Sequence, residues 1–134
     1  MLFEAAPKID IREQGPLSLA FVGDAVLELL VRGRLVGTTR LQPNRLHTVA
    51  THYVSAHAQS RELEVLEPLL TEQEAAVLRR GKNASKATVA KHATVQEYRA
   101  STGFECLLGW LYLQGRSGRI QELFDALWAG YQPE

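Results

Sequence analysis

Apolar residues recur at helical spacing along almost the whole chain, and this spacing restricts the fold more than any other feature of the sequence. Between residues 16 and 36 the apolar positions fall three and four residues apart, which predicts one amphipathic helix. Pro16 suits the first turn of this helix, and Gly37 suits its end. No long stretch alternates apolar and polar residues, and no Asn-Gly or Asp-Gly hairpin signal occurs. The pattern therefore predicts an all-α fold.

Two further helices are predicted in the next part of the chain. Residues 41–60 form a second amphipathic stretch with Pro43 near its start, so we expect one helix through this region. Residues 62–70 predict a short helix that is broken near Pro68, because proline cannot continue the hydrogen-bond pattern of a helix interior.

Residues 71–81 have clear signals at both helix ends. Thr71 and Glu74 have the spacing of a capping box, and Gly81 suits the helix end. Residues 82–95 show no clean period, so we expect a loop with at most a short helical turn.

Two apolar helices complete the chain. They are predicted over residues 102–115 and 117–131, with Gly115 separating them and Ser117 as the cap of the second. Since no internal repeat or low-complexity tract interrupts the pattern, residues 1–134 are expected to form a single all-α domain.

Composition narrows the class of protein. Hydrophobic residues make up 46% of the 134 residues, which is enough for one core. No apolar run reaches the roughly 18 residues of a membrane span, and the N-terminal residues lack the pattern of a signal peptide. Cys106 is the only cysteine, which excludes an intrachain disulfide and favours a cytoplasmic protein. The formal net charge is +0, so nucleic-acid binding would require a local basic cluster.

Acidic residues occur inside the two most apolar stretches. Asp24 and Glu28 lie within LAFVGDAVLELLVRG, and Glu105 lies within TGFECLLGWLYL. A buried carboxylate costs several kcal/mol unless it is paired, hydrogen-bonded or bound to a metal. If the two helices pack together, their acids can meet and bind a hard cation such as Mg²⁺.

Simpler interpretations of the same acids remain open. Asp24 could cap a helix that begins after Gly23. Glu28 could form an exposed ion pair with Arg32, four residues later. Glu105 could pair with an arginine, such as Arg80 or Arg99.

A basic segment lies between Glu74 and Glu97, an interval without any acidic residue. The basic residues of this interval are Arg79, Arg80, Lys82, Lys86, Lys91 and His92. Such a cluster can bind the phosphates of a nucleic acid, and the absence of interleaved aromatic residues favours a duplex over a single strand. A solvated basic loop is the alternative.

Two motifs together resemble a known family. LAFVGDAVLELLV resembles the signature helix of the ribonuclease III endonuclease domain, and STGFECLLGWLYLQG resembles its second acidic motif. The intervening YVSAHAQ also fits. The chain is most similar to the small bacterial class called Mini-ribonuclease III, of which LRRGKN and YRASTGFE are typical. This class has the catalytic domain without an appended double-stranded-RNA-binding domain. The resemblance covers roughly residues 12–130.

The resemblance implies a homodimeric helical bundle that cleaves double-stranded RNA by Mg²⁺-dependent hydrolysis, with Mn²⁺ as a substitute. The products carry a 5′-phosphate and a 3′-hydroxyl, and the implied substrate is a precursor of large-subunit (23S) ribosomal RNA. Asp24 and Glu105 are implied as catalytic residues and metal ligands, with Asp24 also orienting the attacking water. Phe21 is implied in the dimer interface. The implied RNA-binding residues are Arg79, Arg80, Lys82, Asn83 and Lys86.

The chain departs from full-length ribonuclease III at two acidic positions. Ala20 and Thr102 stand where that enzyme has a glutamate and an aspartate. The Mini class shows the same thinning of acids, which implies that water fills more of the cation's coordination shell. A non-catalytic duplex-RNA-binding or ribosome-assembly module on the same fold is the alternative. A helical protein-interaction domain with a merely solvated basic loop is a third hypothesis.

Overall fold

A computed structural model describes residues 7–86 and 93–133, and within these ranges it contains helices and no strand. The all-α prediction is therefore confirmed for the described part of the chain. No helix in these ranges is long and apolar enough to cross a membrane. The α-helices are α1 (Pro16–Thr38), α2 (Pro43–Val54), α3 (Ala56–Leu66), α4 (Glu72–Ala84), α5 (Val95–Leu113) and α6 (Ser117–Gly130), with 3-10 helices η1 (Ile11–Glu13) and η2 (Glu67–Leu69).

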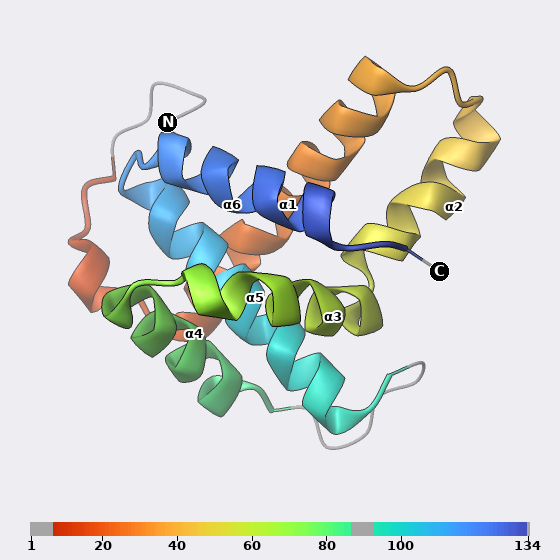
Figure 1. Cartoon of the computed structure of the whole chain (residues 1–134). Coiled ribbons are helices and arrows are strands. Elements are labelled where there is room, and N and C mark those ends of the chain that lie inside the picture. Colours follow the sequence, from red (N-terminus) through yellow and green to blue (C-terminus); the bar gives the residue numbers. More distant parts are fainter. Residues whose placement is uncertain (1–6, 87–92, 134) are drawn as a thin grey trace.

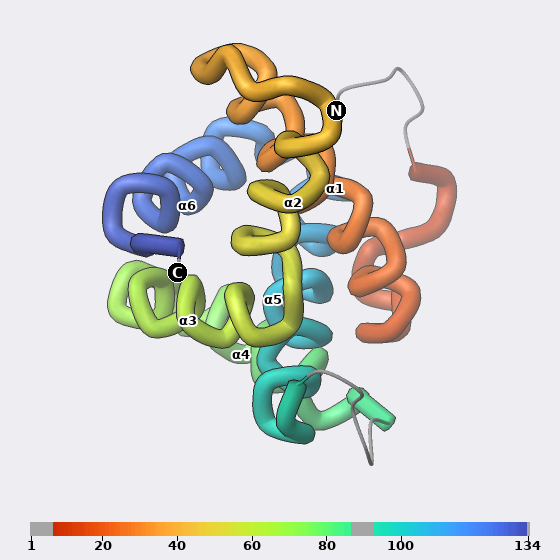
Figure 2. Tube along the Cα trace, turned by 90° about the vertical axis from the view of Figure 1, so that its right-hand side faces the viewer, coloured from red at the N-terminus to blue at the C-terminus, as the bar shows by residue number. Residues whose placement is uncertain are grey.

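Helix α5 is the centre of the bundle (Figure 1). It packs against α1, α3, α4 and α6, and Figure 2 shows it between α1 on one side and α3 on the other. Its residues from Ser101 to Leu111 are all buried except Glu105. A helix that is largely apolar on all its sides belongs in the interior of a bundle. Glu105 is the polar exception in this buried run.

The predicted single helix over residues 41–60 is wrong, because two helices meet at Ser55. The Ser55 backbone is extended, with φ −63° and ψ 157°, and its side chain accepts a hydrogen bond from the backbone N–H of Ala58. This capping contact starts α3 in a new direction. Residues 62–66, predicted to begin a separate short helix, instead form the end of α3, and the break near Pro68 is the 3-10 helix η2.

The capping box of α4 is confirmed, whereas the predicted end of this helix is wrong. Thr71 and Glu74 exchange both side-chain-to-backbone hydrogen bonds at its N-terminus. The helix continues through Gly81 to Ala84. An added Cβ at Gly81 would lie 2.7 Å from the Cβ of Cys106, so this glycine allows α4 to approach α5 rather than stopping the helix.

The two C-terminal helices are confirmed, but the first of them begins earlier than predicted. Helix α5 begins at Val95, because Thr94 and Glu97 form a second capping box that the sequence analysis missed. Gly115 makes the turn after α5 with a φ of 71°, as its predicted role requires. Arg116 occupies the cap position of α6, and Ser117 is its first helical residue rather than its cap.

Candidate catalytic site

Helices α1 and α5 approach each other until backbone touches backbone. An added Cβ at Gly23 would lie 1.6 Å from the carbonyl oxygen of Glu105, and one at Gly109 would lie 1.9 Å from the carbonyl oxygen of Leu19. Only glycine fits at either position without moving a helix. Asp24 follows Gly23 directly, and Glu105 is itself part of the contact. The close crossing therefore carries both predicted acids to the same place.

The Asp24 and Glu105 side chains meet at this crossing. Burial raises the pKa of the Glu105 carboxyl to about 7, against the opposing effect of a hydrogen bond from Gln59. The charge of Asp24 and a direct carboxyl–carboxyl contact with it add to the rise, as does the charge of Glu28. Asp24 itself is exposed. The site is thus a pair of like charges that is open to solvent on the α1 side, an arrangement that a cation would stabilise.

Gln59 is the third polar side chain of this site and was not among the residues predicted from the sequence. Its side chain is 1% exposed, and its Nε2 donates to Oε2 of Glu105 at 3.0 Å. The same nitrogen donates to the carbonyl oxygen of Val54, also at 3.0 Å. The only sequence signal for Gln59 was its place in the YVSAHAQ stretch, because a contact between α3 and α5 has no local pattern.

The carboxylate oxygens of this site suit a hard divalent cation that keeps several coordinated water molecules. Asp24 and Glu105 would supply carboxylate oxygens, the ligands that Mg²⁺ and Mn²⁺ prefer. Within residues 7–86 and 93–133, no group of three or more His, Cys, Asp or Glu side chains could hold a metal ion. A cation at this pair would therefore depend on two protein carboxylates, and water or substrate oxygens would complete its coordination.

The structure decides between the alternatives for the two acids of α1. Asp24 lies well inside the helix, so it does not cap a helix start. Glu28 accepts a hydrogen bond from Nε of Arg32 at 3.0 Å, which confirms the predicted ion pair four residues apart. The Glu28 carboxylate is therefore paired with the exposed Arg32, and Glu28 affects the pKa of Glu105 only through its charge.

The remaining alternative for Glu105, an arginine partner, is wrong for Arg99. The Arg99 guanidinium donates to the C-terminal carbonyl and amide groups of α4 instead. Ala20 and Thr102, the two positions without the expected acids, are 7% and 8% exposed. The hydroxyl of Thr102 donates to the backbone carbonyl of Tyr98, so it is used within α5. These positions are part of the packing around the pair and add no charge to it.

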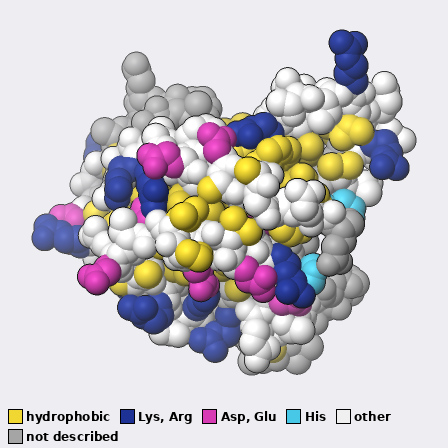
Figure 3. All heavy atoms as spheres, viewed as in Figure 1, with side chains coloured by type: hydrophobic (Ala, Val, Ile, Leu, Met, Phe, Trp, Pro, Cys, Tyr) yellow, Lys and Arg dark blue, Asp and Glu magenta, His cyan; other side chains and the backbone are white. Residues whose placement is uncertain are grey.

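The predicted RNA-binding residues fall into two groups. Arg79, Arg80 and Lys86 are exposed near the end of α4. Lys82 forms an ion pair with Glu67 at 3.3 Å, and Asn83 accepts a hydrogen bond from Arg99. Figure 3 shows Lys and Arg side chains along the lower edge of the molecule near α4, with acidic side chains close by. The predicted cationic positions Lys91 and His92 lie outside the described residues.

An exposed apolar groove runs beside the acidic pair. Phe21, predicted in a dimer interface, is 83% exposed. Together with Leu29, Tyr112 and the intervening small apolar residues of α1, it lines a groove that also includes Asp24. Leu29 is 55% exposed. Large apolar side chains so open to water on one helix face are characteristic of an interaction surface.

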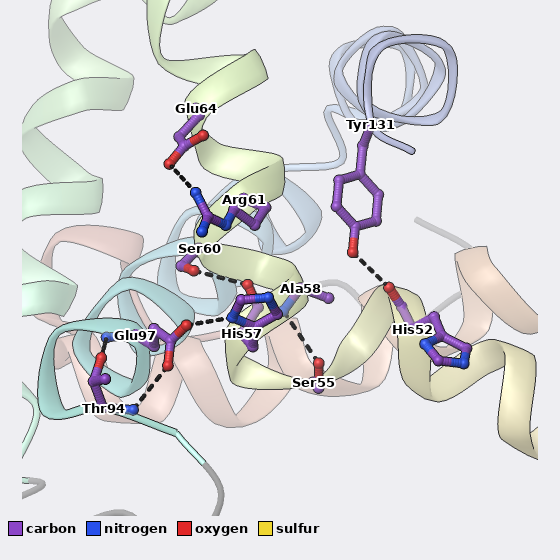
Figure 4. A network of polar contacts seen from close by, with 10 residues as sticks. All are labelled: His52, Ser55, His57, Ala58, Ser60, Arg61, Glu64, Thr94, Glu97 and Tyr131. Atoms are coloured by element: carbon purple, nitrogen blue, oxygen red, sulfur yellow. Dashed lines mark hydrogen bonds and ion pairs between the residues drawn. The ribbon is translucent and has the colours of Figure 1, made fainter. Parts of the chain in front are cut away.

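A polar network fastens α3 to the start of α5 (Figure 4). His57 of α3 and Glu97 of α5 are joined through Nδ1 and Oε2, and Glu97 also closes the capping box with Thr94. Hydrogen bonding by His57 and by the Thr94 backbone lowers the pKa of Glu97, with the backbone contact the larger effect. In Figure 4, Ser55 caps the start of α3 and His57 lies in its first turn. The helix that carries Gln59 is therefore held against the helix that carries Glu105.

Comparisons with known proteins agree on one family. The family model described as Ribonuclease III domain matches residues 17–116. A Mini-ribonuclease 3 from Symbiobacterium thermophilum is 49% identical over 111 residues, covering 83% of this chain and 85% of that protein. A Mini-ribonuclease 3 from Enterococcus faecalis is 43% identical over 118 residues, covering 87% and 89%. A crystal structure of a Fusobacterium nucleatum protein has a TM-score of 0.81 and 28% identity, covering 92% of this chain and 98% of its own. The chain therefore belongs to the ribonuclease III family, in sequence and in its all-helical fold.

Proposed function

We propose that this protein is an endoribonuclease that hydrolyses double-stranded RNA with the help of Mg²⁺, for which Mn²⁺ can substitute. The observation that carries the proposal is the meeting of Asp24 and Glu105 at the α1–α5 crossing, in a chain of the ribonuclease III family. Two carboxylates so close together cost stability, and a bound cation would offset that cost.

In the proposed mechanism, both carboxylates would hold the cation, and Asp24 would also orient the attacking water. A bound divalent cation supplies positive charge for the phosphoryl oxygens and lowers the pKa of a coordinated water. Asp24 is exposed, so its free oxygen can accept a hydrogen bond from the attacking water and orient it. Glu105 is held by Gln59 from the side of the core. Hydrolysis leaves a 5′-phosphate and a 3′-hydroxyl.

Cleavage of a long duplex RNA tests this proposal. Asp24→Asn and Glu105→Gln should each reduce the Mg²⁺-dependent cleavage rate by at least about 100-fold, because each removes a charged ligand. Circular dichroism and the thermal midpoint should show that both variants fold. Glu28→Gln is the matched control, since Glu28 pairs with Arg32, and it should retain most of the rate. Full activity in Asp24→Asn would refute the proposed site.

We infer that the exposed cations at the C-terminal end of α4 and just after it bind the RNA backbone. Arg79, Arg80 and Lys86 are open to solvent, whereas Lys82 is paired with Glu67. Replacing the three exposed residues together with alanine should weaken duplex binding and flatten its salt dependence by roughly one unit of log–log slope per lost phosphate contact. Lys82→Ala is the control and should change the slope less. An unchanged slope in the triple variant would remove α4 from the binding surface.

We further propose that the apolar groove beside Asp24 is covered by a second copy of the chain. The supporting observation is Phe21, which is 83% exposed and lines a groove that includes Asp24. A homodimer would bury this side chain and bring two acidic pairs to one duplex. Phe21→Asp should therefore give a monomer by light scattering coupled to size-exclusion chromatography. A dimer of unchanged stability in this variant would contradict the proposed interface.

The biological substrate is proposed from the resemblance of the sequence motifs to the Mini-ribonuclease III class. Proteins named Mini-ribonuclease 3 match most of this chain, and we infer that the substrate is a precursor of large-subunit (23S) ribosomal RNA in the cytoplasm. Incubation of the purified protein with deproteinised precursor RNA and Mg²⁺ should give cuts at a defined duplex position. Cuts scattered over every duplex region would argue against this specific role.

A non-catalytic RNA-binding module remains the second candidate. It is favoured by the absence of a third metal-binding side chain at the pair among the described residues, where Ala20 and Thr102 replace acids. The two candidates differ in their response to Mg²⁺. Duplex binding that is unaffected by Mg²⁺, with no product from wild-type protein, would favour the module.

A further inference from the structure

Gln59 is a buried residue whose side-chain amide links the start of α3 to Glu105 of the candidate catalytic site. Its Nε2 donates to Oε2 of Glu105 and to the carbonyl oxygen of Val54, at 3.0 Å in each case. The two amide hydrogens are therefore both used. Its Oε1 is buried and, among the described residues, has no hydrogen-bond partner.

The break between α2 and α3 creates the acceptor that holds this amide. In a continuous helix the carbonyl of Val54 would accept the backbone N–H of Ala58. Here Ala58 donates to the side chain of Ser55 instead, at 3.1 Å. The freed Val54 carbonyl is then available to Gln59. The sequence feature that begins α3 thus also orients the glutamine.

Only one orientation of the Gln59 amide suits these partners. If oxygen and nitrogen were exchanged, Oε1 would face a carbonyl oxygen and a carboxylate oxygen, and both are acceptors. The observed orientation leaves Oε1 unpaired in the interior, a costly arrangement that a leucine at this position would avoid. The hydrogen bond to Glu105 is the interaction that a glutamine provides here and a leucine could not.

We propose that Gln59 is a positioning residue, which holds one oxygen of Glu105 so that the carboxylate faces Asp24 and the divalent cation. This inference rests on the function proposed above, because it takes the acidic pair as the cation site. Gln59 lies on the core side of Glu105 and acts through it, without touching the cation or the RNA. The contact between His57 and Glu97 in Figure 4 joins α3, which carries Gln59, to α5, which carries Glu105.

Affinity for Mn²⁺, measured by electron paramagnetic resonance without RNA, tests the proposal independently of catalysis. Gln59→Leu and Gln59→Met remove both donors at similar side-chain length. Each should weaken Mn²⁺ binding by about tenfold or more, the usual effect of losing an outer partner of a metal ligand. Ser60→Ala is the matched control on α3, since it removes a hydrogen bond to the His57 carbonyl, and its affinity should equal that of the wild type.

Two further measurements separate positioning from a merely structural role. The cleavage rate of the Gln59 variants should recover toward the wild-type value as Mg²⁺ is raised, and duplex binding in EDTA should stay unchanged. In wild-type protein, the side-chain amide signals of Gln59 in NMR spectra should shift when Mg²⁺ is added. This last measurement needs no substitution, so it decides the question even if both variants fail to fold.

Parallel titration of Asp24→Asn and Glu105→Gln distinguishes the ways in which the proposal can fail. If these two variants bind Mn²⁺ as tightly as wild type, the proposed cation site itself is wrong. If they lose binding while the folded Gln59 variants keep wild-type affinity, only the positioning role is overturned. An unshifted Gln59 amide on Mg²⁺ addition overturns it as well.

Discussion

Glu62 carries the strongest prediction about stability, because it is a carboxyl group sealed in the core. Its side chain is 0% exposed on α3, and neither carboxylate oxygen has a hydrogen-bond partner among the described residues. Burial raises its pKa from 4.5 to about 9. The group is therefore protonated in the folded protein at neutral pH. We expect Glu62→Gln, which preserves shape and removes the titration, to stabilise the protein at that pH.

The size of the effect follows from proton linkage. Below pH 4.5 the Glu62 carboxyl is protonated in both states and has no pH-dependent effect on the free energy of unfolding. As pH rises from there to about 9, only the unfolded state releases the proton, so wild-type stability falls by about 1.4 kcal/mol per pH unit. At pH 7 the accumulated loss is about 3 kcal/mol, a large share of the ~5–15 kcal/mol of a typical domain.

Urea unfolding of wild type and Glu62→Gln at pH 5, 6, 7 and 8 measures this loss directly. The difference in unfolding free energy should grow in favour of the variant by about 1.4 kcal/mol per pH unit. Protein concentration is held constant, because self-association would shift apparent stability. Glu64→Gln is the control on the same helix, since Glu64 is exposed and paired with Arg61, and its difference from wild type should stay flat. If the difference in unfolding free energy between Glu62→Gln and wild type does not change with pH, the conclusion that Glu62 is buried and protonated is refuted.

Four further substitutions test helix packing, the buried ion pair and the cap of α3. Gly109→Ala should lower the free energy of unfolding by at least about 3 kcal/mol, because its methyl group would lie 1.9 Å from a backbone oxygen of α1. Gly33→Ala is the control in thermal unfolding. An added Cβ at Gly33 has no neighbour within 4 Å, so this variant should be stabilised by up to about 1 kcal/mol. Arg119→Ala should cost about 3 kcal/mol in urea unfolding, since it leaves the fully buried Glu74 carboxylate without its 2.8 Å and 2.9 Å partner; a loss below about 1 kcal/mol would contradict this. Ser55→Ala should cost about 1 kcal/mol through the lost cap of α3, and an unchanged thermal midpoint would show that the cap is dispensable.

Local patterns predicted the parts of the structure that depend on neighbours in the chain. The capping box of Thr71 and Glu74 and the turn at Gly115 are found as expected. The ends of helices were predicted less well. Gly81 looks like a stop signal, but its missing side chain serves the contact with α5. Ser55 looks like an ordinary helix residue, but its hydroxyl caps a new helix. In both cases the same residue type suits two roles, and the packing partner selects one.

The amino-acid sequence alone determined the helical class and singled out Asp24 and Glu105, because helical periodicity and the cost of a carboxylate in an apolar stretch are both local properties. Only the tertiary structure brought the two acids together. Their meeting depends on α1 and α5 touching through Gly23 and Gly109, a contact between segments about 80 residues apart that leaves no periodic signal in either segment. The same holds for Gln59, whose amide reaches the site only because α3 folds back against α5.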